Sequence, residues 1–271
     1  MADWLILLPA CILCLLMILT HTYLGLHVLA RGIIFVDLAL AQVAALGMSI
    51  AFLSGEEAHG VTAQLYAFGA TLLVALAFSR LRTIPDKTTR EVTIGWVYVV
   101  ATALSIVILS RSNQGMEELK SLFNGNILWT TWEEISVIAI AYAVLAVVHS
   151  IYRKRFYTLS FSNDDEAKPS FLWEFLFFAS FAVVITLAVN LAGILLVFAL
   201  LIIPAFSASI IATTFLVRLK LGWLLAVVGS LVGLWLAYHA DLPVGATVVS
   251  VLGSLPLIAV ALNYVKPKLI S

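Results

Sequence analysis

The stretch GLHVLARGIIFVDLALAQVAALGMSIAFL, residues 25–53, decides the fold class of this chain. It is predominantly apolar, yet it carries Arg31, Asp37 and Gln42. An apolar run of this length predicts a membrane-spanning helix, and ionisable side chains within such a helix are costly. These three residues are therefore the first candidates for a functional or a structural site.

The composition of the whole chain agrees with this stretch. Of the 271 residues, 63% are hydrophobic and only 11% are charged, and the mean hydropathy is +1.10. A soluble domain of this length needs more polar surface. The sequence predicts a polytopic membrane protein, with residues 1–271 forming a single transmembrane domain.

Long apolar runs recur along the chain and predict an all-α bundle of about eight or nine spans. The runs are residues 4–28, 33–53, 63–79, 92–110, 135–152, 171–189, 192–212, 221–238 and 244–264. The strands of a transmembrane barrel would instead alternate apolar and polar residues over about ten positions. The division between the sixth and seventh runs, around Asn190 and Gly193, is the least distinct, so both eight and nine spans remain open.

The basic residues predict the orientation, because cytoplasmic loops carry the excess of lysine and arginine. Thirteen of the 15 fall on one side of the predicted spans, and only Arg111 and Lys120 fall on the other. The thirteen are Arg31, Arg80, Arg82, Lys87, Arg90, Arg153, Lys154, Arg155, Lys168, Arg218, Lys220, Lys266 and Lys268. We expect the N-terminus outside and the C-terminus in the cytoplasm of a cell with this protein in its plasma or inner membrane.

Several catalytic and nucleotide-binding motifs are absent from the sequence. It contains no GxxxxGK[ST] phosphate loop, no HExxH and no GxSxG. We therefore expect a transporter or channel rather than an enzyme, with no cofactor held by this chain. The energy for transport must come from a partner protein or from an ion gradient.

Four segments resemble the membrane permeases of ATP-binding-cassette importers for zinc, manganese and chelated iron. They are residues 25–53, LFNGNILWTTWEE (122–134), GILLVFALLIIPAFSASIIA (193–212) and ADLPVGATVVSVLG (240–253). The resemblance spans nearly the whole chain. It implies a relative of the type II importers, a homodimer with a central path, two cytoplasmic ATPase subunits that bind ATP, and an external solute-binding protein.

The second span departs from the pattern GDALSHA that is common in this family. Aligning on Gly47 places Leu38 at the family aspartate and Gln42 at the family histidine, with Asp37 one position early. Asp37 and Gln42 are the candidate residues for a metal site or translocation path. An alternative is a structural role, in which Asp37 forms a salt bridge with Arg31.

A second candidate region follows the proline of the seventh run. Small residues, AFSASIIATTF, precede the basic segment VRLKLG. Small side chains permit close helix packing, and the basic residues place this stretch at the cytoplasmic interface. The resemblance implies that it is the ATPase coupling region, with the candidate residues Pro204, Ser207, Ser209, Arg218 and Lys220.

Other polar residues in or near the spans receive simpler predictions. We expect His21 and His27 either to lie at the membrane interface or to form hydrogen bonds between helices. We expect His149 to lie at the level of the lipid headgroups and Glu174 to anchor the end of its span. Outside the spans, we expect a short amphipathic helix within residues 111–134 and a solvated linker over residues 153–170.

Together these observations predict the permease subunit of an importer for a divalent metal ion (zinc, manganese or iron) or a metal chelate. A separate ATPase would drive alternating access. An alternative is a stand-alone secondary transporter of a small cation or an organic solute, and another is a structural membrane subunit without transport activity.

Overall fold

The computed structural model describes residues 3–56, 60–112, 114–161 and 170–269. Within these residues the secondary structure is entirely helical. The helices are α1 (Asp3–Arg31), α2 (Val36–Leu53), α3 (Val61–Phe78), η1 (Leu81–Thr83), α4 (Lys87–Leu109), α5 (Gly115–Asn124), η2 (Ile127–Trp129), α6 (Trp132–Ile151), α7 (Arg153–Phe161), α8 (Phe171–Ile211), α9 (Phe215–Ala240) and α10 (Val244–Leu269).

Eight of these helices are long and apolar enough to cross a membrane, counted over the described residues. A helix satisfies its backbone hydrogen bonds internally, which an apolar solvent requires. The first turns of α4 and α6 also receive side-chain caps: Asp86 accepts from the backbone N–H of Thr89 at 2.7 Å, and Thr131 forms a capping box with Glu134. The all-α prediction is confirmed.

Helix α8 contains a sharp break at Gly193. Its 41 residues would span about 60 Å if straight, twice the roughly 30 Å apolar core of a bilayer. Gly193 instead has φ 76° and ψ 159°, outside the helical region. A Cβ at this position would lie 2.3 Å from the backbone nitrogen of Gly125, so only glycine permits this conformation and this contact.

The two arms of α8, before and after Gly193, run in opposite directions. In the first arm, Glu174 contacts Arg31 at the end of α1, whereas Leu191 accepts a hydrogen bond from Asn126 beyond α5. In the second arm, the backbone of Leu201 again lies against α1, at Gly25. The predicted division near Asn190 and Gly193 is confirmed, and the chain reverses there.

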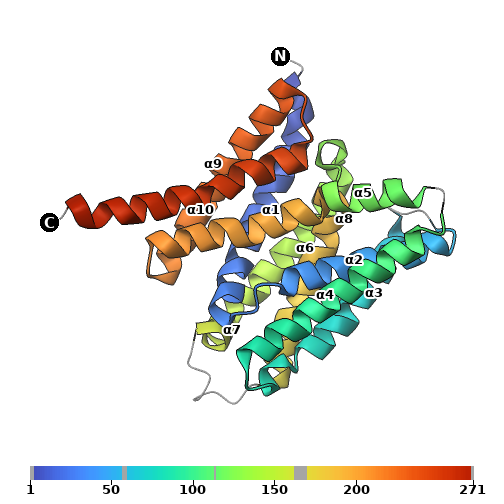
Figure 1. Ribbon diagram of the computed structural model, residues 1–271, viewed down its shortest axis with the longest axis horizontal. Coiled ribbons are helices and arrows are strands. Elements are labelled where there is room, and N and C mark those ends of the chain that lie inside the picture. The colour runs from blue at the N-terminus through green and yellow to red at the C-terminus, as the bar shows by residue number, and fades with distance from the viewer. Residues whose placement is uncertain (1–2, 57–59, 113, 162–169, 270–271) are drawn as a thin grey trace.

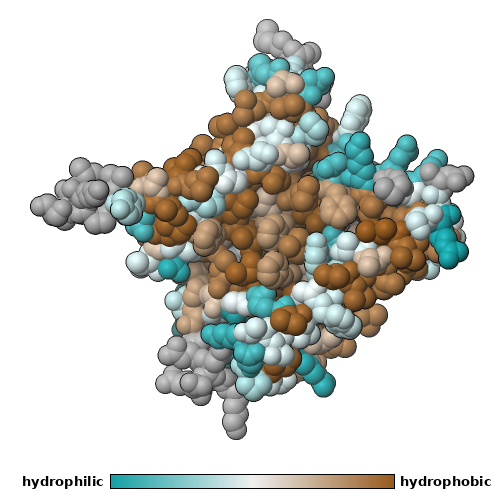
Figure 2. Space-filling view, viewed as in Figure 1, coloured by the Kyte–Doolittle hydropathy of each residue, from teal (hydrophilic) through white to brown (hydrophobic). Residues whose placement is uncertain are grey.

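The connections between the helices gather at two ends of the bundle (Figure 1). The connections from α1 to α2, from α3 to α4 and from α8 to α9 lie toward the lower left of the view. Helix α5 and the break in α8 lie toward the upper right. Figure 2 shows hydrophobic residues over the middle of the molecule and hydrophilic residues gathered toward the upper right and the lower end.

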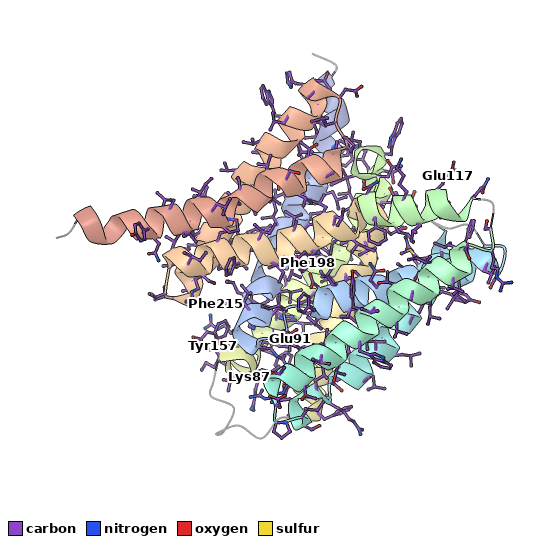
Figure 3. The ribbon with its side chains drawn as sticks, in the orientation of Figure 1. Lys87, Glu91, Glu117, Tyr157, Phe198 and Phe215 are labelled. Carbon is purple, nitrogen blue, oxygen red and sulfur yellow. The ribbon has the colours of Figure 1, made fainter. Side chains whose placement is uncertain are left out.

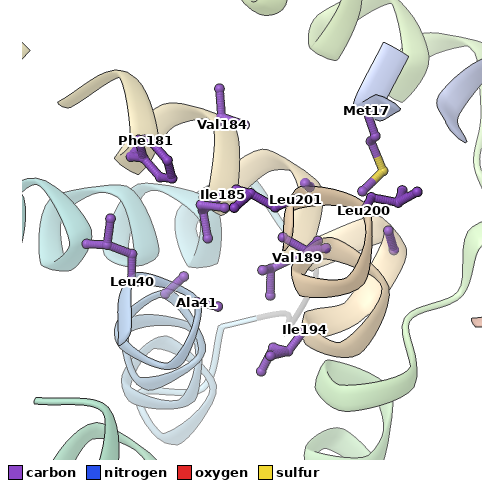
Figure 4. Close-up of a cluster of buried hydrophobic side chains, with 14 of the residues drawn as sticks. Met17, Leu40, Ala41, Phe181, Val184, Ile185, Val189, Ile194, Leu200 and Leu201 are labelled. Carbon is purple, nitrogen blue, oxygen red and sulfur yellow. The ribbon is translucent and has the colours of Figure 1, made fainter. Parts of the chain in front are cut away.

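The core lies around α8, and side chains from α1, α2 and both arms of α8 meet there (Figure 4). Leu40 and Ala41 of α2 lie near Ile185 of the first arm, and Met17 of α1 lies near Leu200 of the second arm. The helices α3, α4, α6 and α10 are less buried and expose many large apolar side chains. The core therefore holds α2, which carries Asp37 and Gln42, and α8, which carries Pro204, Ser207 and Ser209, at the centre of the protein.

Candidate functional site

Helix α2 is the element that positions the first candidate site. It packs against α3, α4 and α8, and most of its residues are buried. The contact with α3 is unusually close at Gly47, where a Cβ would lie 2.6 Å from the Cα of Ala67. This close packing encloses the polar side chains of α2 inside the protein.

Asp37 lies in the first turn of α2, where the amide end of the helix favours a negative charge. The residue is only 1% exposed, and neither of its carboxylate oxygens has a hydrogen-bond partner among the described residues. Buried side-chain oxygens without partners are rare in folded proteins. Asp37 therefore has an unused capacity to accept hydrogen bonds or to coordinate a cation.

Gln42 lies further along the same helix, and the atom that it leaves without a partner among the described residues is a hydrogen-bond donor rather than a cation ligand. It is also 1% exposed, and its Nε2 has no partner within the described part of the chain. Five helical positions separate it from Asp37, or about 140° around the axis. The two side chains do not share a face, so the structure does not assemble them into one compact pair.

The alternative role of Asp37, a salt bridge with Arg31, is wrong. Arg31 instead forms a close ion pair with Glu174 of α8, across 143 residues of sequence. Arg82 of η1 approaches the other oxygen of the same carboxylate, Nη1 to Oε1 at 3.3 Å. The guanidinium of Arg31 also lies 4.3 Å from the ring centre of Phe177, a cation–π distance.

The prediction that Glu174 anchors the end of its span is also wrong. The residue is fully buried and compensates two arginines, which ties α1, η1 and α8 together. A lone carboxylate within a long apolar run on the basic side of the chain was a signal for such a site, because a buried charge requires a counter-ion. The sequence does not show which of the many cations supplies it.

Two histidines, His27 and His149, join different helices by hydrogen bonds. His27 Nδ1 lies 2.7 Å from Ser160 Oγ of α7, which confirms a hydrogen bond between helices. His21 instead bonds to the carbonyl of Met17 in its own helix. His149 is buried, and its ring nitrogens lie 3.1 Å from Tyr23 Oη and from Ser180 Oγ. Its level relative to the lipid headgroups stays a prediction.

The second candidate region lies at the end of α8 and the start of α9. Pro204 and Ser207 are buried, and the hydroxyls of Ser207 and Ser209 donate to backbone carbonyls of their own helix at 2.8 Å. Arg218 Nε donates to the carbonyl of Ala212 at 2.9 Å and fixes the turn between the helices. Lys220 is exposed. The surface at this turn also includes exposed Phe206, Leu216 and Val217.

Two further predictions concern segments outside the spans. The predicted short helix within residues 111–134 is confirmed as α5. The prediction of a linker over residues 153–170 is wrong in its first half, where α7 forms. Residues 162–169, including Lys168, lie outside the described residues. Within the described ranges, no three His, Cys, Asp or Glu side chains converge to form a metal site.

Comparison with known proteins now assigns the chain to a family. The family model described as the ABC 3 transport family matches residues 3–263. The chain belongs to the ABC 3 transport family. It is therefore a multi-pass membrane component of a transport system and not an enzyme.

Individual relatives of this ABC 3 chain carry names that refer to metals. It is 25% identical over 241 residues to a probable iron transport system membrane protein of Haemophilus influenzae, covering 88% of this chain and 83% of that protein. It is also 25% identical over 197 residues to the manganese transport system membrane protein MntB of Synechocystis, covering 72% and 62% of the two chains. The solved structure of PsaBC from Streptococcus pneumoniae in complex with Fab matches with a TM-score of 0.77 at 20% identity, covering 98% of this chain and 96% of that one. This structural match shows that the fold is shared.

Proposed function

We propose that this chain is the permease subunit of an ATP-binding-cassette importer for a divalent metal ion or a metal chelate. The family match over residues 3–263 carries the proposal. The names of the iron and manganese relatives support a metal as the cargo. In the complete importer, two copies of the chain form the path, two ATPase subunits bind the cytoplasmic side, and an external binding protein delivers the cargo.

The bundle end that holds Arg31, Arg82 and Arg218 faces the cytoplasm in this proposal. The excess of basic residues at this end supports the orientation, with the N-terminus outside and the C-terminus inside. The ATPase then binds the turn between α8 and α9, where Phe206, Leu216, Val217 and Lys220 are exposed. Pro204 and Ser207 are buried in α8 next to this turn and would set its position. The hydrogen bond from Arg218 to the carbonyl of Ala212 would fix its conformation.

Asp37 and Gln42 serve as cargo-contacting residues of the path. The burial of both residues supports this role, and so does the absence of a hydrogen-bond partner for either Asp37 oxygen among the described residues. An oxygen without an internal partner is available to a cation in a conformation that opens the site. Carboxylate and amide oxygens suit hard divalent cations such as manganese. Because the family Asp/His pair is absent, we expect these residues to guide the cargo rather than to hold it tightly.

The test is the metal content of cells that lack this chain, grown under metal limitation and complemented with wild type, Asp37→Asn or Asp86→Asn. Mass spectrometry would follow Mn, Fe, Co, Ni and Zn at matched membrane levels of the three proteins. We expect wild type and Asp86→Asn, a change at an exposed carboxylate, to restore one metal, and Asp37→Asn to fail. Unchanged content of every metal in the deletion strain would contradict a metal cargo.

A second measurement addresses the stand-alone secondary transporter, the principal alternative. Affinity purification of the tagged chain from its native membrane should recover an ATPase subunit, and uptake should stop when ATP is depleted at a constant ion gradient. Uptake that follows the gradient and persists without ATP would support the secondary transporter instead.

A further inference from the structure

A cavity of about 370 Å³ lies at the end of the bundle that carries the basic residues. It is bounded by the end of α1, the connection through η1 to α4, the end of α7 and the start of α9. Its lining residues are Ala30, Arg31, Ile33, Leu81, Arg82, Lys87, Arg90, Leu159, Ser160, Phe161, Phe178 and Arg218. In Figure 3, Lys87 of α4, Tyr157 of α7 and Phe215 of α9 mark this end, and Glu117 of α5 marks the opposite one.

The charges around the cavity have one predominant sign. All of its charged lining residues are cations: Arg31, Arg82, Lys87, Arg90 and Arg218. Three carboxylates lie nearby: Glu174 offsets part of this charge by pairing with Arg31 and Arg82, Asp86 caps α4, and Glu91 accepts from the backbone N–H of Ile34 at 2.6 Å. Five cations face these three carboxylates, so positive charge remains in excess. The cavity therefore attracts an anion.

Backbone contacts fix two of these cations in place before any ligand arrives. Arg90 Nε donates to the carbonyl of Ile84 at 2.6 Å, and Arg218 Nε donates to that of Ala212 at 2.9 Å. A cation held in this way loses little conformational freedom when it binds an anion. Arg90 and Arg218 are therefore preorganised for binding an anion, in contrast to lysines that move freely at a surface.

Arg31 supplies a second and independent indication of a ligand. Its side chain is 8% exposed, and its Nη1 is buried without a hydrogen-bond partner in the described part of the chain. The same residue lines the cavity. A guanidinium presents a planar fork of donors that matches the oxygens of a phosphate group.

We propose that this cavity binds the phosphate headgroup of an anionic phospholipid from the membrane leaflet on the basic side. The apolar lining residues Ile33, Leu81 and Phe178 are suited to the glycerol and upper acyl atoms, while the arginines and Lys87 bind the phosphate. Basic pockets between membrane helices at cytoplasmic headgroup level are typical sites for acidic lipids. A lipid there links α1, α4, α7 and α9, and this role is independent of the cargo.

The test uses the purified full chain in neutral detergent, with native mass spectrometry and thermal unfolding under titration with phosphatidylglycerol. The double variant Lys87→Gln/Arg218→Gln removes two cations of the cavity. The matched control Lys154→Gln/Arg155→Gln removes two exposed cations from α7, outside the cavity lining. Because Arg218 also fixes a turn, the single variant Lys87→Glu, at an exposed position, serves as a second probe.

We expect saturable binding of phosphatidylglycerol to wild type and to the control double variant, with affinity reduced at least tenfold in Lys87→Gln/Arg218→Gln and also in Lys87→Glu. Phosphatidylcholine should bind more weakly than phosphatidylglycerol. Equal loss of affinity in both double variants would overturn the site, because it would indicate attraction to general surface charge. If inorganic phosphate alone raises the unfolding midpoint, and phosphatidylglycerol raises it no further, the cavity binds a phosphate group but not the lipid. That result would overturn the proposal of a lipid ligand. If only the co-purified ATPase subunit raises the unfolding midpoint, the cations of the cavity contact a protein partner instead of a lipid. That result would also overturn the proposal.

Discussion

Glu174 and Asp37 are both buried carboxylates at the same end of the bundle, yet their surroundings are opposite. Glu174 contacts two arginines and links three elements, whereas Asp37 has no hydrogen-bond partner for either oxygen among the described residues. A buried carboxylate with its counter-ions in place is part of the architecture. A buried carboxylate without them costs stability and is retained only where another requirement, such as cargo binding, favours it.

The largest effect that this comparison predicts is the loss of stability on Glu174→Gln. The substitution leaves Arg31 and Arg82 buried without their counter-ion, and breaking such a pair costs about 3–5 kcal/mol. Thermal unfolding of the purified chain should show a markedly lower midpoint and a reduced yield of folded protein.

The control for this prediction is Glu91→Gln, at a carboxylate that is only partly buried and accepts from the backbone N–H of Ile34. We expect a much smaller loss of stability there. Equal midpoints for Glu174→Gln and wild type would show that the arginines find other partners, and would remove the distinction between the two carboxylates.

The second prediction is the reverse pattern at Asp37. Because the side chain has no partner to lose, Asp37→Asn should leave the free energy of unfolding unchanged or raise it by about 1 kcal/mol, while uptake falls at least tenfold. Unfolding and uptake would be measured on the same preparation, reconstituted with its ATPase. A stability loss as large as that of Glu174→Gln would place Asp37 among the structural residues.

Gln42 provides a third and smaller test. Replacing it by leucine removes a buried amide whose Nε2 has no partner, so we expect a change in the free energy of unfolding within about 1 kcal/mol. A clear decrease in uptake at this unchanged stability would support its contact with the cargo. Destabilisation by several kcal/mol would show that the amide oxygen makes an essential contact within the fold.

The sequence predicted the spans well, because a run of apolar residues and the thickness of a bilayer are both properties of local sequence. It also indicated the reversal near Gly193, where two runs nearly meet. It could not predict that Arg31 pairs with Glu174 rather than with Asp37, since 143 residues separate the partners. Proximity in sequence favoured Asp37, but neither oxygen of Asp37 has a hydrogen-bond partner among the described residues.

The sequence could not predict the basic cavity either, because its lining residues are far apart in the chain. The positive-inside pattern placed Arg31, Arg82, Arg90 and Arg218 on one side of the membrane, but not around one cavity. Such a cavity requires the ends of α1, α4, α7 and α9 to meet, which depends on helix packing. Charge bias along a sequence therefore predicts a side of the membrane, and only tertiary contacts predict a site.

The smallest predicted effect concerns Asp86. This carboxylate is exposed to water, unlike the buried Glu174 and Asp37. Hydrogen bonds from the hydroxyl and the backbone N–H of Thr89 hold the pKa of Asp86 below its ordinary value. A folded pKa below the unfolded pKa of about 3.9 means that the cap stabilises α4 above that pH and loses this effect as pH falls through the folded pKa. Asp86→Ala should therefore lower the unfolding midpoint slightly at pH 7, and the difference in midpoint between this variant and wild type should shrink as the solution approaches pH 3.

The control is Asp86→Ser, which retains a capping oxygen that does not titrate, so its midpoint should exceed that of Asp86→Ala at every pH. A difference between wild type and Asp86→Ala that does not depend on pH would show that the charge of Asp86 contributes nothing. The stabilisation by this carboxylate would then come from its capping oxygen alone, in contrast to Glu174, whose charge compensates two buried arginines.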